Sequence, residues 1–241
     1  MPPGSAVRLR VVGDHNPAYP SHRELDAALG LLPAGTTGAW LGTDDPGVRD
    51  LTGVDGLWIA PGSPYRDDEA VLAVIGAART GGVPLLATCG GFQYAALEYA
   101  RHVAGIPTAV HAEVEPGAPD AVIAPLACSL VGQVRTVRAV PGTRLAAIVG
   151  TAPFPGTHFC SFGLAPAFLA RLEAAGLVID AHAPDAGVEG FELPGHPFFQ
   201  ATLFQPQVGA SRGGPLHPLL LAFVEAARTA SVGVGQGASA R

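Results

Sequence analysis

Charged residues and cysteines are scarce in this sequence. Charged side chains make up 14% of the 241 residues, the net charge is -6, and the three cysteines, Cys89, Cys128 and Cys160, lack metal-type spacing. A negative chain is a poor partner for nucleic acid, because phosphate binding needs basic side chains. An odd number of cysteines with this spacing indicates neither a disulfide framework nor a zinc site. We therefore expect no nucleic-acid partner, no metal and no cofactor.

Long apolar runs and a basic leader are also missing. No segment reaches the roughly 18 apolar residues of a membrane span, and the N-terminus has no basic start followed by an apolar run. We therefore expect a cytoplasmic protein without a membrane partner. Hydrophobic residues make up 48% of the chain, with 32 glycines and 23 prolines, which predicts an apolar globule with tight turns. Its size fits one domain over 1–230, followed by a small-residue tail over 231–241 that we expect to be disordered.

Strands and helices are predicted to alternate along the first half of the chain. Short apolar runs indicate buried strands, and apolar residues at helical spacing indicate the helices between them. The expected strands are Val7–Val12, Gly56–Ile59 and Leu85–Thr88, and the expected helices are Ser21–Leu29, Asp67–Thr80 and Gly91–Ala104. This alternation favours an α/β fold with a parallel sheet covered by helices on both faces.

The pattern changes after Pro107, where glycine and proline turns separate strand-like pieces. We expect an antiparallel section in this second half of the chain. Its expected strands are Ala121–Ile123, Val134–Val140, Leu145–Val149, Leu177–Ala181, Val188–Leu193 and Gln200–Phe204, and its expected helices are Pro166–Ala175 and His217–Ala230.

The segment LLATCGGFQYAALEYAR takes an apolar strand directly into a helix, with Cys89 at the corner. Gly90 and Gly91 permit a sharp backbone turn, as in the elbows that present catalytic nucleophiles. A thiol at a helix N-terminus is favoured as thiolate, because the amide dipoles place partial positive charge there. We therefore predict that Cys89 is a nucleophile whose sulfur is accessible and partly ionised. The alternative is an inert, buried cysteine.

A second turn could supply hydrogen-bond donors to this site. Ligands of open parallel sheets bind beyond the carboxyl ends of the strands, so the turns after Ile59, Thr88 and Phe204 should meet at one crevice. The first of these, APGSPYRD, places the N–H groups of Gly62 and Ser63 where they could meet an anionic oxygen. An ordinary proline-glycine turn is the alternative interpretation.

Four motifs give the chain a resemblance to class I glutamine amidotransferase domains, in particular to the glutaminase domain of CTP synthase. VVGDHNPAYPSHRELDAAL is similar to that domain's first strand and helix, and GLWIAPGSPYRD to its glycine oxyanion loop. TCGGFQYAALEYAR resembles its CLGMQxAxIEFAR elbow, and ELPGHPFFQATLFQPQ resembles ELxxHPFFxxxQFHPE. The resemblance covers nearly the whole chain and implies a flavodoxin-like, doubly wound, mostly parallel sheet with an antiparallel section.

The chain also resembles a narrower group, the stand-alone proteins described as CTP synthase C-terminal-region-related (seleno)proteins. That resemblance implies that some relatives carry selenocysteine, which suits nucleophilic or redox chemistry at a sulfur position. No ATP-dependent synthetase domain precedes the matching segment, so we expect that the chain alone does not make CTP.

Matching positions of the family motifs imply several site residues. Cys89 would be the nucleophile, with the N–H groups of Gly90 and of the Gly62 loop as the oxyanion hole. Gln93 and Glu98 match positions that contact the glutamine substrate, which implies a pocket for a small, glutamine-like molecule. Without the resemblance, Glu98 could equally be a solvated helix residue that pairs with the arginine three residues later.

The family's catalytic histidine and glutamate are absent from their usual positions. This chain reads FQPQ where the family reads FHPE, so Gln205 and Gln207 occupy those positions and the Cys-His-Glu triad is degenerate. An amide cannot accept a proton near neutral pH, so Gln205 cannot be a general base or acid. The family's arginine-bearing RHRYEVN segment corresponds here to THFCSFGLAP, which puts its carboxylate clamp in doubt as well.

These departures leave three functional hypotheses. Expelling ammonia from an amide needs a proton donor, so we expect slow glutamine hydrolysis and favour acyl transfer from a small amino-acid-like or activated carbonyl substrate. One alternative is a non-catalytic metabolite-binding or regulatory module, with a synthetase or homo-oligomer partner. The other is a glutaminase rescued by His158, by His217 or by a partner chain.

A separate possibility concerns the cysteines. Cys89 and Cys160 could face one crevice as a resolving pair, unless Cys160 is buried and inert.

Overall fold

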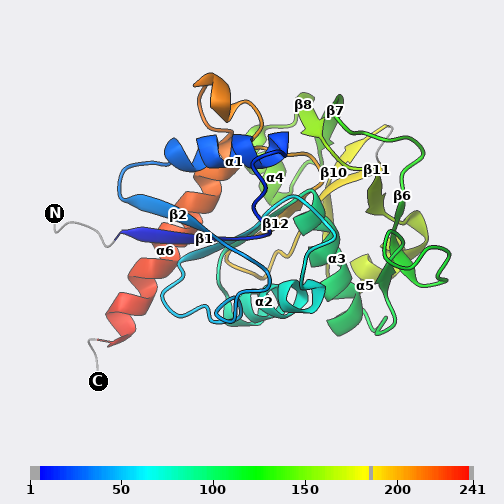
Figure 1. The fold of residues 1–241 in the computed structure, drawn as a ribbon, viewed down its shortest axis with the longest axis horizontal. Coiled ribbons are helices and arrows are strands. Elements are labelled where there is room, and N and C mark those ends of the chain that lie inside the picture. The colour runs from blue at the N-terminus through cyan, green and yellow to red at the C-terminus, as the bar shows by residue number, and fades with distance from the viewer. Residues whose placement is uncertain (1–5, 185–186, 239–241) are drawn as a thin grey trace.

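A nine-stranded mixed sheet forms the centre of the computed structural model, which describes residues 6–184 and 187–238 (Figure 1). The strands lie in the order β2, β1, β3, β4, β12, β11, β10, β7, β8. Their bounds are β1 Val7–Val12, β2 Thr36–Leu41, β3 Gly56–Ile59, β4 Leu85–Thr88, β7 Gln133–Ala139, β8 Phe154–His158, β10 Val178–Ala183, β11 Gly187–Glu192 and β12 Phe199–Thr202. A smaller sheet contains β5 (Val110–His111), β6 (Ala121–Pro125) and β9 (Phe162–Leu164).

The large sheet changes character at β12. From β2 to β12 neighbouring strands are parallel, and Thr202 of β12 lies beside Thr88 of β4. On its other edge β12 pairs antiparallel with β11, and the pairs β11–β10, β10–β7 and β7–β8 are antiparallel too. The predicted mostly parallel α/β sheet with an antiparallel second half is therefore confirmed.

Helices cover both faces of the sheet and divide the core into two clusters (Figure 1). One cluster packs α2, α3 and α5 against the sheet, and the other packs α1, α4 and α6 against the opposite face. The helix bounds are α1 Pro20–Gly30, α2 Asp68–Gly81, α3 Gly90–His102, α4 Arg144–Val149, α5 Leu169–Ala174 and α6 Pro218–Ala238. The central strands β3 and β4 are buried throughout, which explains their nearly continuous apolar sequences.

Local sequence signals explain where α2 begins and ends. The Asp67 carboxylate accepts a hydrogen bond from the N–H of Ala70 at 2.8 Å and caps the helix, while Asp68 and Glu69 place negative charge in its first turn. Gly82 ends the helix in the left-handed conformation with φ of 70°.

Two secondary-structure predictions fail for identifiable reasons. The expected strand Leu145–Val149 is the helix α4, because the Thr143 hydroxyl caps the N–H of Ala146 at 3.3 Å. The short strands β5, β8 and β9 were not expected from the sequence. The strand β2 was not expected either. Gly38 interrupts the alternation of its side chains, and a Cβ at this position would lie only 2.6 Å from the side chain of Leu29 in α1.

The ends of two other predicted helices also differ from expectation. The helix expected over Pro166–Ala175 begins with a 3₁₀ turn, η1 (Pro166–Phe168), before α5. The helix α6 continues past Ser231, where we expected the disordered tail to begin. Residues 239–241 of that tail lie outside the described residues.

Asp180 of β10 is fully buried, and burial raises its pKa to about 8. The Gln200 amide donates a hydrogen bond to Oδ2 of Asp180, which partly opposes the shift, whereas Oδ1 has no hydrogen-bond partner. The folded protein therefore holds a proton on Asp180 at pH values where the unfolded chain, with a pKa of about 3.9, has released it.

We expect this proton to make stability depend on pH. Between about pH 4 and pH 8 the folded state binds more protons than the unfolded state, so the free energy of unfolding falls as the pH rises. Asp180→Asn removes this contribution. From pH 5 to pH 7 the variant should gain up to about 1.4 kcal/mol per pH unit relative to wild type in urea unfolding. Parallel pH curves for the two proteins would contradict the expectation.

Candidate active site

Cys89 lies at the corner between β4 and α3 with φ of 54° and ψ of -108°. Among the described residues it is the only non-glycine with positive φ, a conformation that costs about 1–3 kcal/mol and marks functional sites. The strand holds the turn in place, because the N–H of Cys89 donates to the Thr202 carbonyl of β12 at 2.8 Å. Gly91 is required by packing, since a Cβ there would lie 2.4 Å from the Ile59 carbonyl oxygen. The sharp turn predicted from the sequence is therefore present.

Polar groups surround the Cys89 sulfur although the residue is only 5% exposed. A hydrogen bond from the Cys160 thiol is the main reason that the pKa of Cys89 is lowered, and burial opposes this effect. The N–H groups of Gly90 and Phe159 also lower the pKa, and so does the side-chain amide of Gln205, although its Nε2 forms no hydrogen bond of normal length. The expectation of an accessible sulfur is thus wrong, because these neighbours cover it. The same neighbours provide the hydrogen-bond donors that favour the thiolate.

The predicted donor turn lies against the start of α3. Gly62 has φ of 106°, and it and Ser63 are half-buried. A Cβ on Gly90 would lie 2.8 Å from the backbone nitrogen of Ser63, so the two backbone segments are in close contact. His22 of α1 anchors the turn through a hydrogen bond of 2.9 Å between its Nε2 and the Pro61 carbonyl oxygen.

Gln93 connects this turn to the smaller sheet. Its Oε1 accepts hydrogen bonds from the Ser63 hydroxyl at 2.8 Å and from Nε2 of His111 at 3.1 Å, and its Nε2 donates to the Phe162 carbonyl at 2.9 Å. Burial lowers the pKa of His111 to about 4, so this imidazole is neutral at physiological pH. Gln93 is 2% exposed, and in this geometry its side chain holds the Ser63 turn in place.

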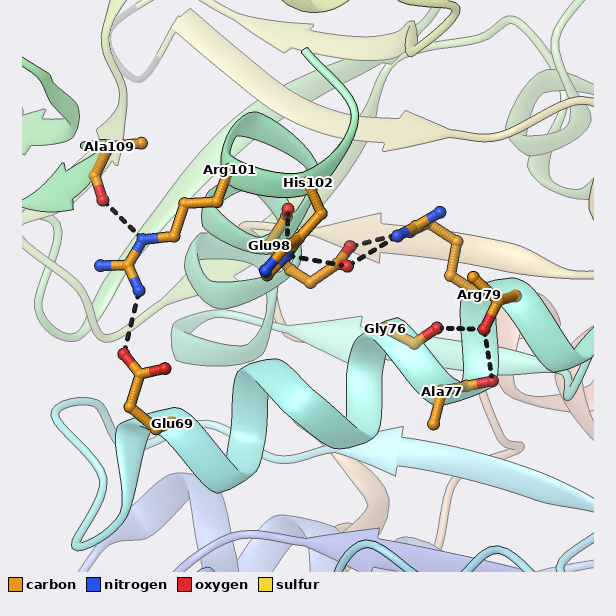
Figure 2. A network of polar contacts seen from close by, with 9 residues as sticks. Glu69, Gly76, Ala77, Arg79, Glu98, Arg101, His102 and Ala109 are labelled. Atoms are coloured by element: carbon orange, nitrogen blue, oxygen red, sulfur yellow. Dashed lines mark hydrogen bonds and ion pairs between the residues drawn. The ribbon is translucent and has the colours of Figure 1, made fainter. Parts of the chain in front are cut away.

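Glu98 lies in the second half of α3, and its side chain points toward α2 (Figure 2). It is 1% exposed and pairs with Arg79 through hydrogen bonds of 2.8 and 2.9 Å, while His102 approaches the same carboxylate at 3.2 Å. Glu98 follows Cys89 by nine positions, which corresponds to about 13 Å along a helix. Its contact with a substrate stays a prediction that this geometry does not favour. The alternative pairing with Arg101 is wrong, because Arg101 binds Glu69 at 3.0 Å.

Gln205 and Gln207 form a buried amide pair after β12. Nε2 of Gln207 donates to Oε1 of Gln205 at 2.9 Å, and the backbone N–H of Gln205 donates to the Thr157 carbonyl at 2.9 Å. Gln205 is 2% exposed and Gln207 is fully buried. The side chain at position 207 therefore orients the one at position 205, which in turn lowers the pKa of the Cys89 thiol.

The two histidines that could rescue a glutaminase, His158 and His217, both have other partners in the structure. His158 of β8 is fully buried, and its Nε2 lies 2.8 and 2.9 Å from the carboxylate oxygens of Glu189. His217 packs on the rings of Phe154 and Phe204 and binds the N–H of Leu219, and burial lowers its pKa to about 4. Both histidines keep the roles proposed for them only as predictions.

Glu189 is the site residue that the sequence analysis missed. It is fully buried in β11, pairs with His158, and its negative charge contributes to the raised pKa of Cys160. The signal in the sequence is a carboxylate inside the strand GVEGFE, between Val188 and Phe191, because a charge in a buried strand requires a partner.

In residues 6–184 and 187–238, no cluster of three or more histidine, cysteine or acidic side chains is suited to hold a metal ion. Within the same residues, no helix combines the length and the apolar character that crossing a membrane requires.

Comparisons by sequence identify relatives among CTP synthases, whereas no protein-family model matches the chain. The enzyme of Pyrobaculum calidifontis is 34% identical over 193 residues, which cover 76% of this chain and 36% of the relative. That of Synechococcus sp. strain JA-2-3B'a(2-13) is 33% identical over 243 residues, which cover 93% of this chain and 44% of the relative. The chain thus spans less than half the length of these relatives.

Comparisons by structure extend the match to isolated glutaminase domains. The glutaminase domain of Trypanosoma brucei CTP synthase with bound acivicin has a TM-score of 0.78 at 22% identity, over 92% of this chain and 94% of that domain. A glutamine amidotransferase of Methylobacillus flagellatus has a TM-score of 0.54 at 12% identity, over 95% of this chain and 93% of that one. These likenesses confirm the predicted fold. The chain is a class I glutamine amidotransferase-like protein, related to the glutaminase region of CTP synthases.

Proposed function

We propose that the protein is a Cys89-dependent acyl-transfer enzyme of the amidotransferase type that acts on a small amino-acid-like or activated carbonyl substrate. The observation that carries this proposal is the elbow of Cys89, where a strained backbone with φ of 54° presents a sulfur whose pKa is lowered by surrounding donors. Backbone strain and a lowered thiol pKa at one residue are typical of activated cysteine nucleophiles.

The proposed reaction begins with attack of the Cys89 thiolate on the substrate carbonyl carbon. The negative charge then moves to the carbonyl oxygen, which the N–H groups of Gly90 and of the Gly62 turn would stabilise. When the tetrahedral intermediate collapses, the bond to the leaving group breaks and an acyl thioester remains on Cys89. A thiolate or another stable anion can leave without a proton, whereas an amide nitrogen needs a proton that Gln205 cannot supply. We therefore propose slow turnover of glutamine itself.

Labelling with acivicin tests this function. Acivicin is an electrophilic glutamine analogue, and a relative with this fold has been solved with it bound. We expect covalent modification of Cys89 in the wild-type protein and in Cys128→Ser, which changes an exposed cysteine, and none in Cys89→Ala. Equal labelling of wild type and Cys89→Ala, measured by mass spectrometry of peptides, would exclude Cys89 as the reactive group.

Burial of the sulfur favours a second candidate function, that of a binding module. Cys89 is 5% exposed, and a buried amide pair occupies the family's base and acid positions. Such a module would sense a glutamine-like metabolite, or dock on a synthetase subunit or on a second copy of this chain. A binder should show the same ligand-induced thermal shift in Cys89→Ser as in wild type, whereas only an enzyme would lose turnover in that variant. For either function we propose a cytoplasmic location, where thiols are kept reduced.

A further inference from the structure

Two of the three cysteines, Cys89 and Cys160, lie in the same core cluster with their side chains adjacent, although they are far apart in the sequence. The Cys160 thiol donates a hydrogen bond to the Cys89 sulfur. Both are free and almost completely buried, with 5% and 6% of their surface exposed. Cys128 is exposed, as expected of a cysteine outside this contact.

The backbone places Cys160 beside Cys89 through several independent bonds. The N–H of Gln205, just after β12, donates to the Thr157 carbonyl at 2.9 Å, which fixes the end of β8 against the loop that follows β12. The next residues of this segment pass the elbow, where the N–H of Phe159 donates to the Cys89 sulfur. On the far side, the N–H of Leu130 donates to the Cys160 carbonyl at 2.9 Å. The contact of the two sulfurs is therefore a result of the sheet topology.

We propose that Cys89 and Cys160 form a dithiol that a small hydroperoxide oxidises to an intramolecular disulfide. In the first step the Cys89 thiolate attacks the peroxide, the O–O bond breaks, and Cys89 becomes a sulfenic acid while the alkoxide or hydroxide takes up a proton. In the second step the Cys160 sulfur attacks the Cys89 sulfur, the S–O bond breaks, and water leaves with the thiol proton. Two thiols and one hydroperoxide thus give one disulfide, one alcohol or water, and one further water.

The roles of the two sulfurs follow from their surroundings. Cys89 has the lowered pKa and is the nucleophile, whereas the pKa of Cys160 is raised, chiefly by its hydrogen bond to Cys89, so that Cys160 keeps its proton. Oxidation of Cys89 to the sulfenic acid removes the thiolate, and with it the main cause of the raised pKa of Cys160. Cys160 can then act as the resolving thiol. The low exposure of both residues favours a small oxidant such as hydrogen peroxide.

This inference goes beyond the proposed acyl transfer, and its test needs no substrate. The full chain is treated with hydrogen peroxide, free thiols are blocked with N-ethylmaleimide, and the protein is digested with trypsin without reduction. The chain contains no lysine, and cleavage at arginine places Cys89, Cys160 and Cys128 on the separate peptides 80–101, 145–171 and 102–135. We expect a crosslink between peptides 80–101 and 145–171 that disappears with dithiothreitol.

Cys128→Ser is the matched control and should form the same crosslink, whereas Cys89→Ser and Cys160→Ser should not. In Cys160→Ser we expect Cys89 to proceed to the sulfinic acid, because no resolving thiol is present. Sulfinic acid on Cys89 of the wild-type protein, or a disulfide that includes Cys128, would overturn the proposal. The peptide map of the oxidised wild-type protein alone distinguishes these outcomes, even if one of the variants does not fold. Acivicin labelling of Cys89 tests the acyl-transfer proposal separately. If the disulfide forms, this labelling should be lost on oxidation and restored by dithiothreitol.

Discussion

Replacing Gln205 with histidine and Gln207 with glutamate is expected to raise the rate of ammonia release from glutamine by about 10² to 10⁴, the usual contribution of a general acid–base. The physical reason is the geometry of the amide pair. The side chain at position 207 already donates a hydrogen bond of 2.9 Å to the side chain at 205. The side chain at 205 is close enough to the Cys89 sulfur to lower the pKa of this thiol. A glutamate at 207 would orient a histidine at 205 by accepting a hydrogen bond from its ring N–H, and that histidine could protonate the leaving nitrogen.

Two comparisons make this experiment specific. The triple variant that also carries Cys89→Ala should return to the background rate, because the new histidine has no nucleophile to serve. Gln205→His alone should give a smaller increase than the double variant, since no carboxylate orients its imidazole. A double variant that folds and binds acivicin but releases ammonia no faster than wild type would show that more than the missing acid and base limits the reaction.

Arg79→Met is expected to lower the free energy of unfolding by about 3 kcal/mol, because it leaves the Glu98 carboxylate buried without its main partner. Glu98 is 1% exposed, Arg79 contributes two hydrogen bonds to it, and the remaining partner, His102, has a side chain that is 55% exposed (Figure 2). Urea unfolding measures the difference. The matched control is Arg66→Met, which breaks a pair with Asp44 in which both side chains are exposed and should cost less than about 1 kcal/mol.

Glu98→Gln separates a structural role of this carboxylate from a substrate contact. In the ion-pair interpretation the variant loses stability, and Arg79→Met combined with Glu98→Gln costs less than the sum of the two single changes. Its rate of acivicin labelling at Cys89 should match wild type under conditions where both proteins are folded. A variant of unchanged stability that no longer reacts with acivicin would instead support the substrate contact implied by the family resemblance.

The sequence predicts the fold and the corner at Cys89 well, because their signals are local. An apolar strand, one cysteine and two glycines are contiguous, and the structure shows the predicted turn with φ of 54° at Cys89. The exchange of the family's histidine and glutamate for Gln205 and Gln207 is equally visible in the sequence. The error at Leu145–Val149 arose where an apolar run of this length suits a strand or a buried helix, and the cap from Thr143 decides for the helix.

The remaining features of the site depend on contacts between distant segments. Glu98 finds Arg79 because α2 and α3 pack side by side, and nothing in the α3 sequence specifies that partner. The low exposure of Cys89 likewise comes from Phe159, Cys160 and Gln205, which reach it from beyond β8 and β12. Periodicity within one segment cannot reveal such contacts, because they depend on the order in which strands join the sheet.

The dual pairing of β12 has a consequence for how this site responds to strain. The carbonyl of Thr202 in β12 accepts a hydrogen bond from the N–H of Cys89. The same strand joins the parallel part of the sheet to the antiparallel part. A small rotation of one part against the other would therefore alter the separation of the Cys89 sulfur from Cys160 and from Gln205. A molecule that binds to the antiparallel part and rotates it would therefore change the pKa and the reactivity of the Cys89 thiol without contacting it.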